Sequence, residues 1–131
     1  MTRLLLILLL FLSSGPVYAE WVAVGSSESA GGYTGYIDPD TIRRKGDLVK
    51  VWELYDFKTA QTVVGVSFLS RQWQRQYDCV EERGRGLATT EFSGNMGNGN
   101  VVWTDSDEGK WSPVAPESIG KALWKFACGK K

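Results

Sequence analysis

The segment PESIGKALWKFACG, residues 116–129, decides the fold of this chain because its apolar residues recur at helical spacing. They fall at positions i, i+3, i+4 and i+7 of a helix: Ile119, Ala122, Leu123 and Phe126. Pro116 suits the first turn, where its missing N–H costs nothing, and Glu117 suits the positive end of the helix dipole. We therefore predict an amphipathic helix of about three turns that begins near Pro116 and ends at Cys128-Gly129.

Upstream of this helix the chain contains several stretches typical of β-strands, with period-two alternation clearest over residues 21–25 and 65–83. The stretches with this character are residues 21–25, 33–37, 41–44, 48–57, 65–83, 87–93 and 101–104. Residues 58–64 and the Gly/Asn-rich residues 94–100 are expected to be simple connections. The helix must bury its apolar face, and a sheet is the only candidate partner. We predict an α+β fold in which an antiparallel sheet of about six strands carries the C-terminal helix on one face.

The first 19 residues have the organisation of a secretory signal peptide. Arg3 supplies the positive charge, residues 4–12 form the apolar region, and Val17-Tyr18-Ala19 forms a small-residue cleavage site before Glu20. The apolar region is shorter than the roughly 20 residues that a membrane-spanning helix needs, and no later stretch approaches that length. We predict a cleaved signal over residues 1–19 and one periplasmic or secreted domain over residues 20–131.

Cys79 and Cys128 are the only cysteines of the chain. In an exported protein, an even pair of cysteines favours a disulfide over a metal or redox site. The bond would close a loop of about 50 residues, and the chain-entropy model assigns such a loop roughly 4 kcal/mol of stability. It would also pin the C-terminal helix to the strand that carries Cys79.

Composition excludes several classes of function. The 15 basic and 15 acidic residues balance, whereas a nucleic-acid-binding domain needs a basic face. The chain contains no histidine, so it lacks the usual general base of Ser-His and Cys-His enzymes and the commonest metal ligand. Asp105, Asp107 and Glu108 resemble part of a calcium loop but lack its full ligand pattern, which favours an ordinary acidic turn. We expect no cofactor, no metal and no nucleic-acid partner.

Two groups of residues are candidates for ligand binding. Arg71, Trp73, Arg75 and Tyr77 alternate along one strand face. There, arginine beside aromatic rings can stack and donate hydrogen bonds to an anionic ligand. The alternative is a ladder of half-exposed side chains that only shields the sheet. The second group, Arg43-Arg44-Lys45, lies at a predicted hairpin tip. It suits a sulfated glycan or an acidic protein patch, and its alternative is a solvated turn.

Several segments together resemble the surface-adhesin protein E family of Gram-negative bacteria. In chain order they are Tyr36-Ile37-Asp38-Pro39, Thr41-Ile42-Arg43-Arg44, Val49-Lys50-Val51-Trp52, Tyr55-Asp56, Tyr77-Asp78-Cys79, Gly97-Asn98-Gly99, Trp111-Ser112-Pro113-Val114, Pro116-Glu117-Ser118, and Leu123-Trp124-Lys125 with Cys128. The resemblance implies a curved antiparallel sheet whose C-terminal helix is held on the concave face by the two cysteines. It also implies a binding protein for host matrix or serum proteins.

The family's named adhesin is a lipoprotein, whereas Glu20 follows Ala19 here and no cysteine stands at the cleavage site. We therefore expect a periplasmic or secreted protein without a lipid anchor. The main hypothesis is a non-catalytic binding module for a protein or a small anionic ligand, in an oligomeric state that the sequence leaves open. One alternative is a structural or hydrolase-inhibitory envelope protein. Another is a glycosidase, because that chemistry needs only two carboxylates.

Overall fold

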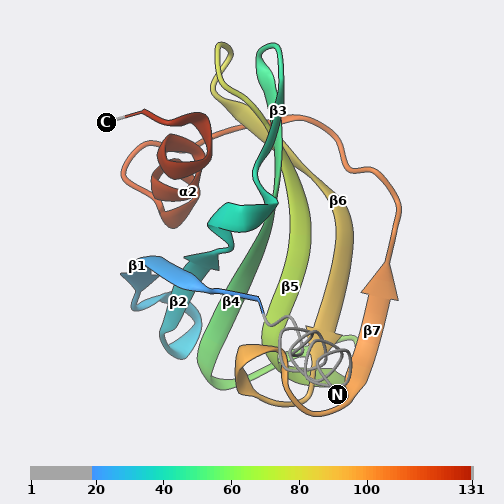
Figure 1. Ribbon diagram of the computed structural model, residues 1–131. Helices are drawn as coiled ribbons and strands as arrows, with labels where there is room; N and C mark the ends of the chain where they lie inside the picture. The colour runs from blue at the N-terminus through green and yellow to red at the C-terminus, as the bar shows by residue number, and fades with distance from the viewer. Residues whose placement is uncertain (1–18, 131) are drawn as a thin grey trace, which may run out of the picture.

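The computed structural model describes residues 19–130, so the expected signal peptide, except for Ala19, lies outside the described residues. A single antiparallel sheet dominates the structure, and the helix α2 (Ile119–Cys128) packs against one of its faces (Figure 1). Along its main path the sheet has six strands in the order β1-β2-β4-β5-β6-β7, which confirms the predicted architecture. Two short strands, β3 and β8, pair beside this path and bring the total to eight.

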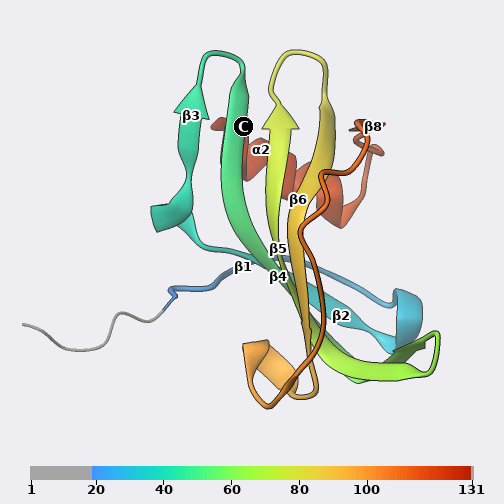
Figure 2. The same cartoon turned by 90° about the vertical axis from the view of Figure 1, so that its right-hand side faces the viewer.

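The strands are β1 (Val22–Ser27), β2 (Tyr33–Ile37), β3 (Arg43–Lys45), β4 (Leu48–Val63), β5 (Val66–Asp78), β6 (Arg83–Phe92), β7 (Val101–Asp105) and β8 (Ser112–Pro113). Three 3₁₀ turns lie between them: η1 (Ser29–Gly31), η2 (Pro39–Thr41) and η3 (Asn95–Gly97). β2 and β3 pair with different parts of the same edge of β4, and β8 pairs with the beginning of β6. Figure 2 shows the long strands β4, β5 and β6 side by side, with α2 behind them.

The longest hairpin differs from the prediction. Residues 58–64 were expected to form a loop, but β4 continues to Val63 and pairs with β5 as far as the partners Val63 and Val66. The ladder is irregular between Asp56 and Gln61, which lets this long ribbon bend. Only Val64 and Gly65 form the turn, both at positive φ. The expected loop is therefore the outer part of a hairpin.

The stretch expected as one strand over residues 65–83 is two strands. β5 ends at Asp78, whose carboxylate accepts hydrogen bonds from the backbone N–H groups of Val80 and Glu81 at 3.1 and 3.0 Å. Side-chain bonds of this kind stabilise a turn at the expense of an extended strand. β6 then begins at Arg83, four residues before the strand predicted over residues 87–93.

The helix is rotated and shifted relative to the sequence-based prediction. It begins at Ile119, where the Ser118 hydroxyl caps it by accepting from the Lys121 N–H at 3.0 Å. Pro116 and Glu117 thus lie before the helix, and Phe126 is 41% exposed instead of buried. The residues that the helix buries are Ile119, Leu123, Trp124, Ala127 and Cys128. They pack against the sheet residues Ile37, Val49, Val51 and Tyr77.

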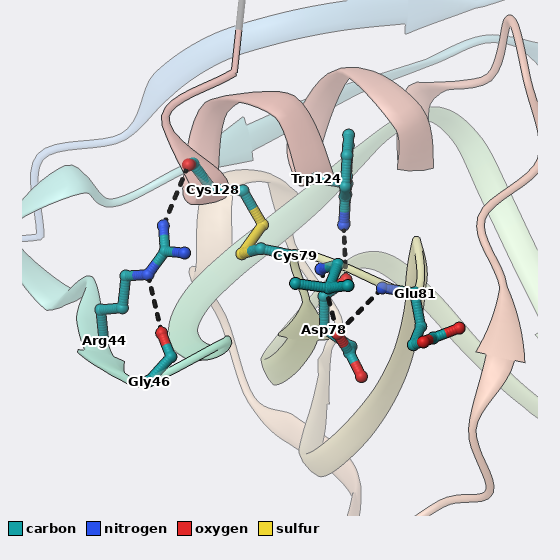
Figure 3. Close-up of a disulfide and its surroundings, with 8 residues drawn as sticks. Arg44, Gly46, Asp78, Cys79, Glu81, Trp124 and Cys128 are labelled. Atoms are coloured by element: carbon teal, nitrogen blue, oxygen red, sulfur yellow. Dashed lines mark hydrogen bonds between the residues drawn. A yellow bond between two sulfur atoms is a disulfide. The ribbon is translucent and has the colours of Figure 1, made fainter.

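The predicted Cys79–Cys128 disulfide is present, with the two Cα atoms 5.6 Å apart (Figure 3). Two hydrogen bonds hold the same end of the helix. The Trp124 indole N–H donates to the carbonyl oxygen of Asp78 at 2.9 Å, and the Arg44 guanidinium donates to the carbonyl oxygen of Cys128 at 3.2 Å. The Trp124 bond and the disulfide both join α2 to the end of β5, which explains why Trp124 and Cys128 are buried and Phe126 is not. Within residues 19–130 no helix is long and apolar enough to cross a membrane.

The Gly/Asn-rich residues 94–100 are more than the simple connection predicted for them. The Met96 N–H donates to the Asp56 carboxylate at 2.8 Å, and the Gly97 N–H donates to the Ser70 hydroxyl at 2.9 Å. The backbone of Gly97 lies against Leu54, which is fully buried although it points away from α2. This segment therefore covers the second face of the sheet where the helix cannot reach.

Candidate functional site

The candidate site lies on the sheet face that packs against α2, which we call the helix-side face. Val49 and Val51 of β4 define it, because both belong to the core beneath the helix. Tyr77 is the register partner of Val49 and belongs to the same core. Side chains alternate along a strand, so every second residue of β4 and β5 shares this face. The helix-side face therefore continues beyond the helix through Glu53 and Tyr55 of β4 and through Arg75, Trp73 and Arg71 of β5.

The four residues Arg71, Trp73, Arg75 and Tyr77 form a continuous stack along β5. The guanidinium carbon of Arg71 lies 5.4 Å from the Trp73 ring centre. The guanidinium carbon of Arg75 lies 5.1 Å from the Trp73 ring and 5.6 Å from the Tyr77 ring. These separations suit cation–π attraction. The structure thus brings the ladder together as the sequence spacing predicted, while its ligand-binding role stays a prediction.

Glu53 holds the middle of this stack from the neighbouring strand. Its carboxylate is fully buried and accepts hydrogen bonds from the Trp73 indole N–H at 3.2 Å and from the Tyr77 hydroxyl. Burial raises the pKa of Glu53 to about 7, against the opposing effects of the Arg75 charge and of the two hydrogen bonds. Burial also raises the pKa of Tyr77 and Tyr55, and the nearby Glu53 adds to both shifts. Glu53 therefore fixes the orientation of the Trp73 ring.

The two arginines of the ladder differ in their charge partners. Arg71 donates two hydrogen bonds, at 2.9 and 2.8 Å, to one carboxylate oxygen of the buried Glu91 on β6. The ion pairs within residues 19–130 do not include Arg75, and its buried Nε atom has no hydrogen-bond partner. Arg71 is therefore neutralised inside the protein, whereas Arg75 keeps an uncompensated set of donors.

A groove of about 550 Å³ opens beside Arg71 and Trp73. It is lined by the tip of the β4–β5 hairpin and by residues of β5, β6 and β7: Val63, Val64, Val66, Arg71, Trp73, Thr89, Glu91 and Trp103. Several of the apolar walls face water, since Val64 is 96% exposed, Val63 52% and Trp103 44%. Trp103 belongs to β7, the last strand of the main path. Exposed apolar groups gathered at one concave place are typical of a binding site.

Sequence reasoning missed most of this groove. It placed Val63 and Val64 in a loop, and it did not single out Trp103 among the six tryptophans. The run Val63-Val64-Gly65-Val66 does contain a usable signal, because apolar β-branched residues flank a glycine-containing turn. The register that places Trp103 opposite Glu91, and Glu91 opposite Arg71, depends on pairing between distant strands.

The groove supplies little for carboxylate chemistry. Glu91 is the single carboxylate among its lining residues, and it already forms an ion pair with Arg71. Hydrolysis of a glycoside by the usual route needs two carboxyl groups on either side of the scissile bond. The walls of this groove are suited to binding an apolar group.

The second predicted group, Arg43-Arg44-Lys45, forms β3 at the other end of β4 from the groove. Arg43 donates to the carbonyl oxygens of Asp40 and Ile42 at 2.8 and 2.9 Å. Arg44 donates to backbone oxygens of Gly46 and Cys128, as Figure 3 shows. These contacts support a structural role for Arg44 at the end of the helix. The cluster and the groove are separate surfaces, and a binding role for the cluster stays a prediction.

Another arginine–aromatic cluster was not predicted. The guanidinium carbons of Arg83 and Arg85 lie 4.7 and 4.4 Å from the ring centre of Trp111. Both charges have partners, because Arg83 pairs with Asp78 at 3.2 Å and Arg85 pairs with Glu108 at 2.9 Å. This cluster ties the segment after β7 to β6.

The acidic turn that carries Glu108 is bonded internally as well. The Asp107 N–H donates to the Asp105 carboxylate at 2.9 Å. Across residues 19–130 the structure contains no group of three acidic or cysteine side chains placed to hold a metal ion.

The chain is similar to one protein family and to several solved structures. A family model described as Surface-adhesin protein E matches residues 21–129. No curated protein matches the chain. Among solved structures, the chain is similar to protein E of Haemophilus influenzae in its crystal form II, with a TM-score of 0.63 and 12% identity over 87% of this chain and 91% of that one.

Two further protein E structures give the same result. One, also from Haemophilus influenzae, has a TM-score of 0.62 and 12% identity over 87% of each chain. The other, from non-typeable Haemophilus influenzae, has a TM-score of 0.60 and 12% identity over 87% of this chain and 78% of that one. At 12% identity, the likeness to these solved structures shows a shared fold.

Proposed function

This chain belongs to the surface-adhesin protein E family, and on that premise we propose that it is an exported binding module. It holds a segment of another protein in the groove beside Arg71 and Trp73. The partner we propose is a protein of the host matrix or serum, in keeping with the family's description as surface adhesins. The role is binding without catalysis. An expected cleavage after Ala19 places the mature domain outside the cytoplasm.

The observation that carries this proposal is Val64 at the tip of the β4–β5 hairpin. Val64 has φ of 49°, a left-handed conformation that β-branched residues rarely adopt. A two-residue turn of this kind strongly favours Asn before Gly, whereas here Val precedes Gly65. The side chain is also 96% exposed, so it contributes nothing to the core. The backbone conformation of Val64 therefore costs stability that no burial of its side chain offsets, and contact with a partner explains why an apolar residue stands there.

The other walls of the groove support the same surface. Trp73 is held by its hydrogen bond to Glu53, which gives a partner a rigid aromatic wall. Trp103 lines the same groove from β7, whose outer edge has no strand partner among the described residues. Large aromatic side chains that lose little entropy on binding are the usual anchors of protein interfaces. An extended segment of a partner can contact both tryptophans and the hairpin tip together.

The experiment measures binding of the mature, disulfide-bonded chain to a panel of immobilised matrix and serum proteins. We expect Val64→Asn to weaken binding and yet to raise the melting temperature by a few degrees, because Asn tolerates the left-handed turn. Trp103→Ala should weaken binding with little effect on stability. Val80→Asn is the matched control, since Val80 is 64% exposed at the opposite end of β5.

Opposite signs for stability and binding are the signature of a residue retained for contact. If Val64→Asn and Trp103→Ala bind every panel protein as the unchanged chain does, the groove is not the binding surface. If Val80→Asn loses binding equally, then loss of any exposed valine weakens binding, and the assignment to this groove is wrong.

A further inference from the structure

We infer that Arg75 forms an anion subsite beside the groove, and that the partner segment places an acidic side chain there, about two residues from the apolar side chain that enters the groove. This inference rests on the proposed function, because it describes the chemistry of the segment held there. It also separates the two ladder arginines, of which only Arg75 is assigned to the ligand.

The first argument is the state of the Arg75 guanidinium. Its guanidinium carbon lies 5.1 Å from the Trp73 ring centre and 5.6 Å from the Tyr77 ring centre, and cation–π attraction to both rings holds it in place. The nearby Glu53 lowers the local positive potential, but its two oxygens accept from Trp73 and Tyr77, and no ion pair to Arg75 forms. Among residues 19–130 the guanidinium has no hydrogen-bond partner. A half-buried guanidinium held by rings in this way is prepared for a carboxylate, which it can bind through two parallel bonds.

The second argument is the open surface opposite Arg75 on β6. Gly84 is the register partner of Tyr77, and a Cβ atom added there would lie 3.1 Å from an Arg75 Nη atom. Arg75 therefore extends across Gly84, which has no side chain to obstruct it. Gly86 is the register partner of Arg75 itself, and nothing lies within 4 Å of the position where its Cβ would stand. Gly84 thus makes room for Arg75 itself, and Gly86 leaves room for a ligand side chain above the β6 backbone.

The third argument is the distance from the groove. Trp73 lines the groove on one side and touches Arg75 on the other. Residues two apart on one strand face are about 7 Å apart along the strand. An extended segment that follows β5 has the same repeat, so an apolar residue against Trp73 brings the residue two positions along to Arg75. Arg71 cannot compete for this acid, because Glu91 already occupies it.

The test is a selection of random linear heptapeptides displayed on phage against the mature, disulfide-bonded chain. The recovered peptides should carry an acidic residue two positions from an aromatic or aliphatic one. A synthetic copy of the best peptide should bind Arg75→Gln about tenfold or more weakly. Gly86→Val should weaken binding similarly by filling the subsite. Changing the acid of the peptide to its amide should cost the same factor for the unchanged chain and nothing for Arg75→Gln.

Lys50→Gln is the matched control, since Lys50 is exposed on the opposite face of β4, between Val49 and Val51, and it should bind the peptide normally. Thermal unfolding of each variant shows that the fold is intact. Peptides that require Trp103 but bind Arg75→Gln unchanged would overturn the subsite and leave the proposed function standing. If no recovered peptide depends on Val64 and Trp103, the proposed function itself is wrong.

Discussion

The indole N–H of Trp124 donates a 2.9 Å hydrogen bond to the carbonyl oxygen of Asp78, the residue that precedes Cys79. The bond is buried and joins the helix to the end of β5 at the same place as the disulfide. It places Trp124 on the inner side of the helix and consequently Phe126 on the outer side. The rotation of α2 is therefore set by contacts to the sheet.

Trp124 and Phe126 should differ sharply in their contribution to stability. Trp124→Phe keeps an aromatic ring but leaves the buried carbonyl of Asp78 without its donor, which costs about 1–3 kcal/mol. Phe126→Ala changes a side chain that is 41% exposed, and it should cost under about 1 kcal/mol. Urea unfolding of the two variants measures both values. A larger loss of stability for Phe126→Ala than for Trp124→Phe would show that Phe126 faces the sheet, as the apolar spacing of the helix predicted.

The disulfide should contribute more to stability than either side chain. Cys79→Ser removes a bond that closes a 49-residue separation, and we expect a loss of roughly 2–5 kcal/mol. The C-terminal helix should then be cut first in limited proteolysis. The double variant Cys79→Ser/Cys128→Ser is the control, since it removes the bond without leaving a lone thiol. Unchanged unfolding midpoints in both variants would show that packing alone holds the helix.

Glu53 should make the protein less stable as pH rises from about 4.5 to about 7. In this interval the unfolded chain has lost the Glu53 proton, while the folded protein keeps it because burial raises the pKa to about 7. Unfolding then releases a proton, so stability declines with pH by an amount on the order of 3 kcal/mol.

Glu53→Gln removes the titrating group, so its stability should change less across this pH interval than that of the unchanged chain. Gln also alters the hydrogen bonds to Trp73 and Tyr77, and this changes the stability at every pH. The measurement therefore compares the slope of unfolding free energy against pH between the variant and the unchanged chain. Identical slopes would mean that the folded carboxyl titrates near its ordinary pKa.

Processing of the N-terminus is a further expectation. The Val17-Tyr18-Ala19 site predicts a mature chain that begins at Glu20 and carries no lipid. Intact mass of the protein recovered from the periplasm or medium measures both properties. Ala19→Arg should block cleavage and keep the precursor with the membrane fraction. A lipid-modified product would contradict the expected localisation.

Local signals in the sequence account for much of the fold. Strand signals predicted most of the sheet, although they missed the outer part of β4 over residues 58–63 and the turn between β5 and β6. The i, i+3, i+4 spacing after Pro116 predicted the C-terminal helix. Export implied an oxidising environment and therefore the Cys79–Cys128 bond, which the structure confirms. The alternation of Arg71, Trp73, Arg75 and Tyr77 predicted their shared face. Each of these properties depends on residues that are close in sequence or on a simple count.

The remaining features depend on partners far along the chain. Nothing near Glu53 in the sequence indicates that Trp73 and Tyr77 will bond to it, because strand register brings the three together. The same register neutralises Arg71 through Glu91 and leaves Arg75 without an ion-pair partner among residues 19–130. Periodicity is a local property and predicts which elements form. Charge pairing and burial are properties of the assembled sheet, so only the tertiary structure decided which ladder arginine has a carboxylate partner.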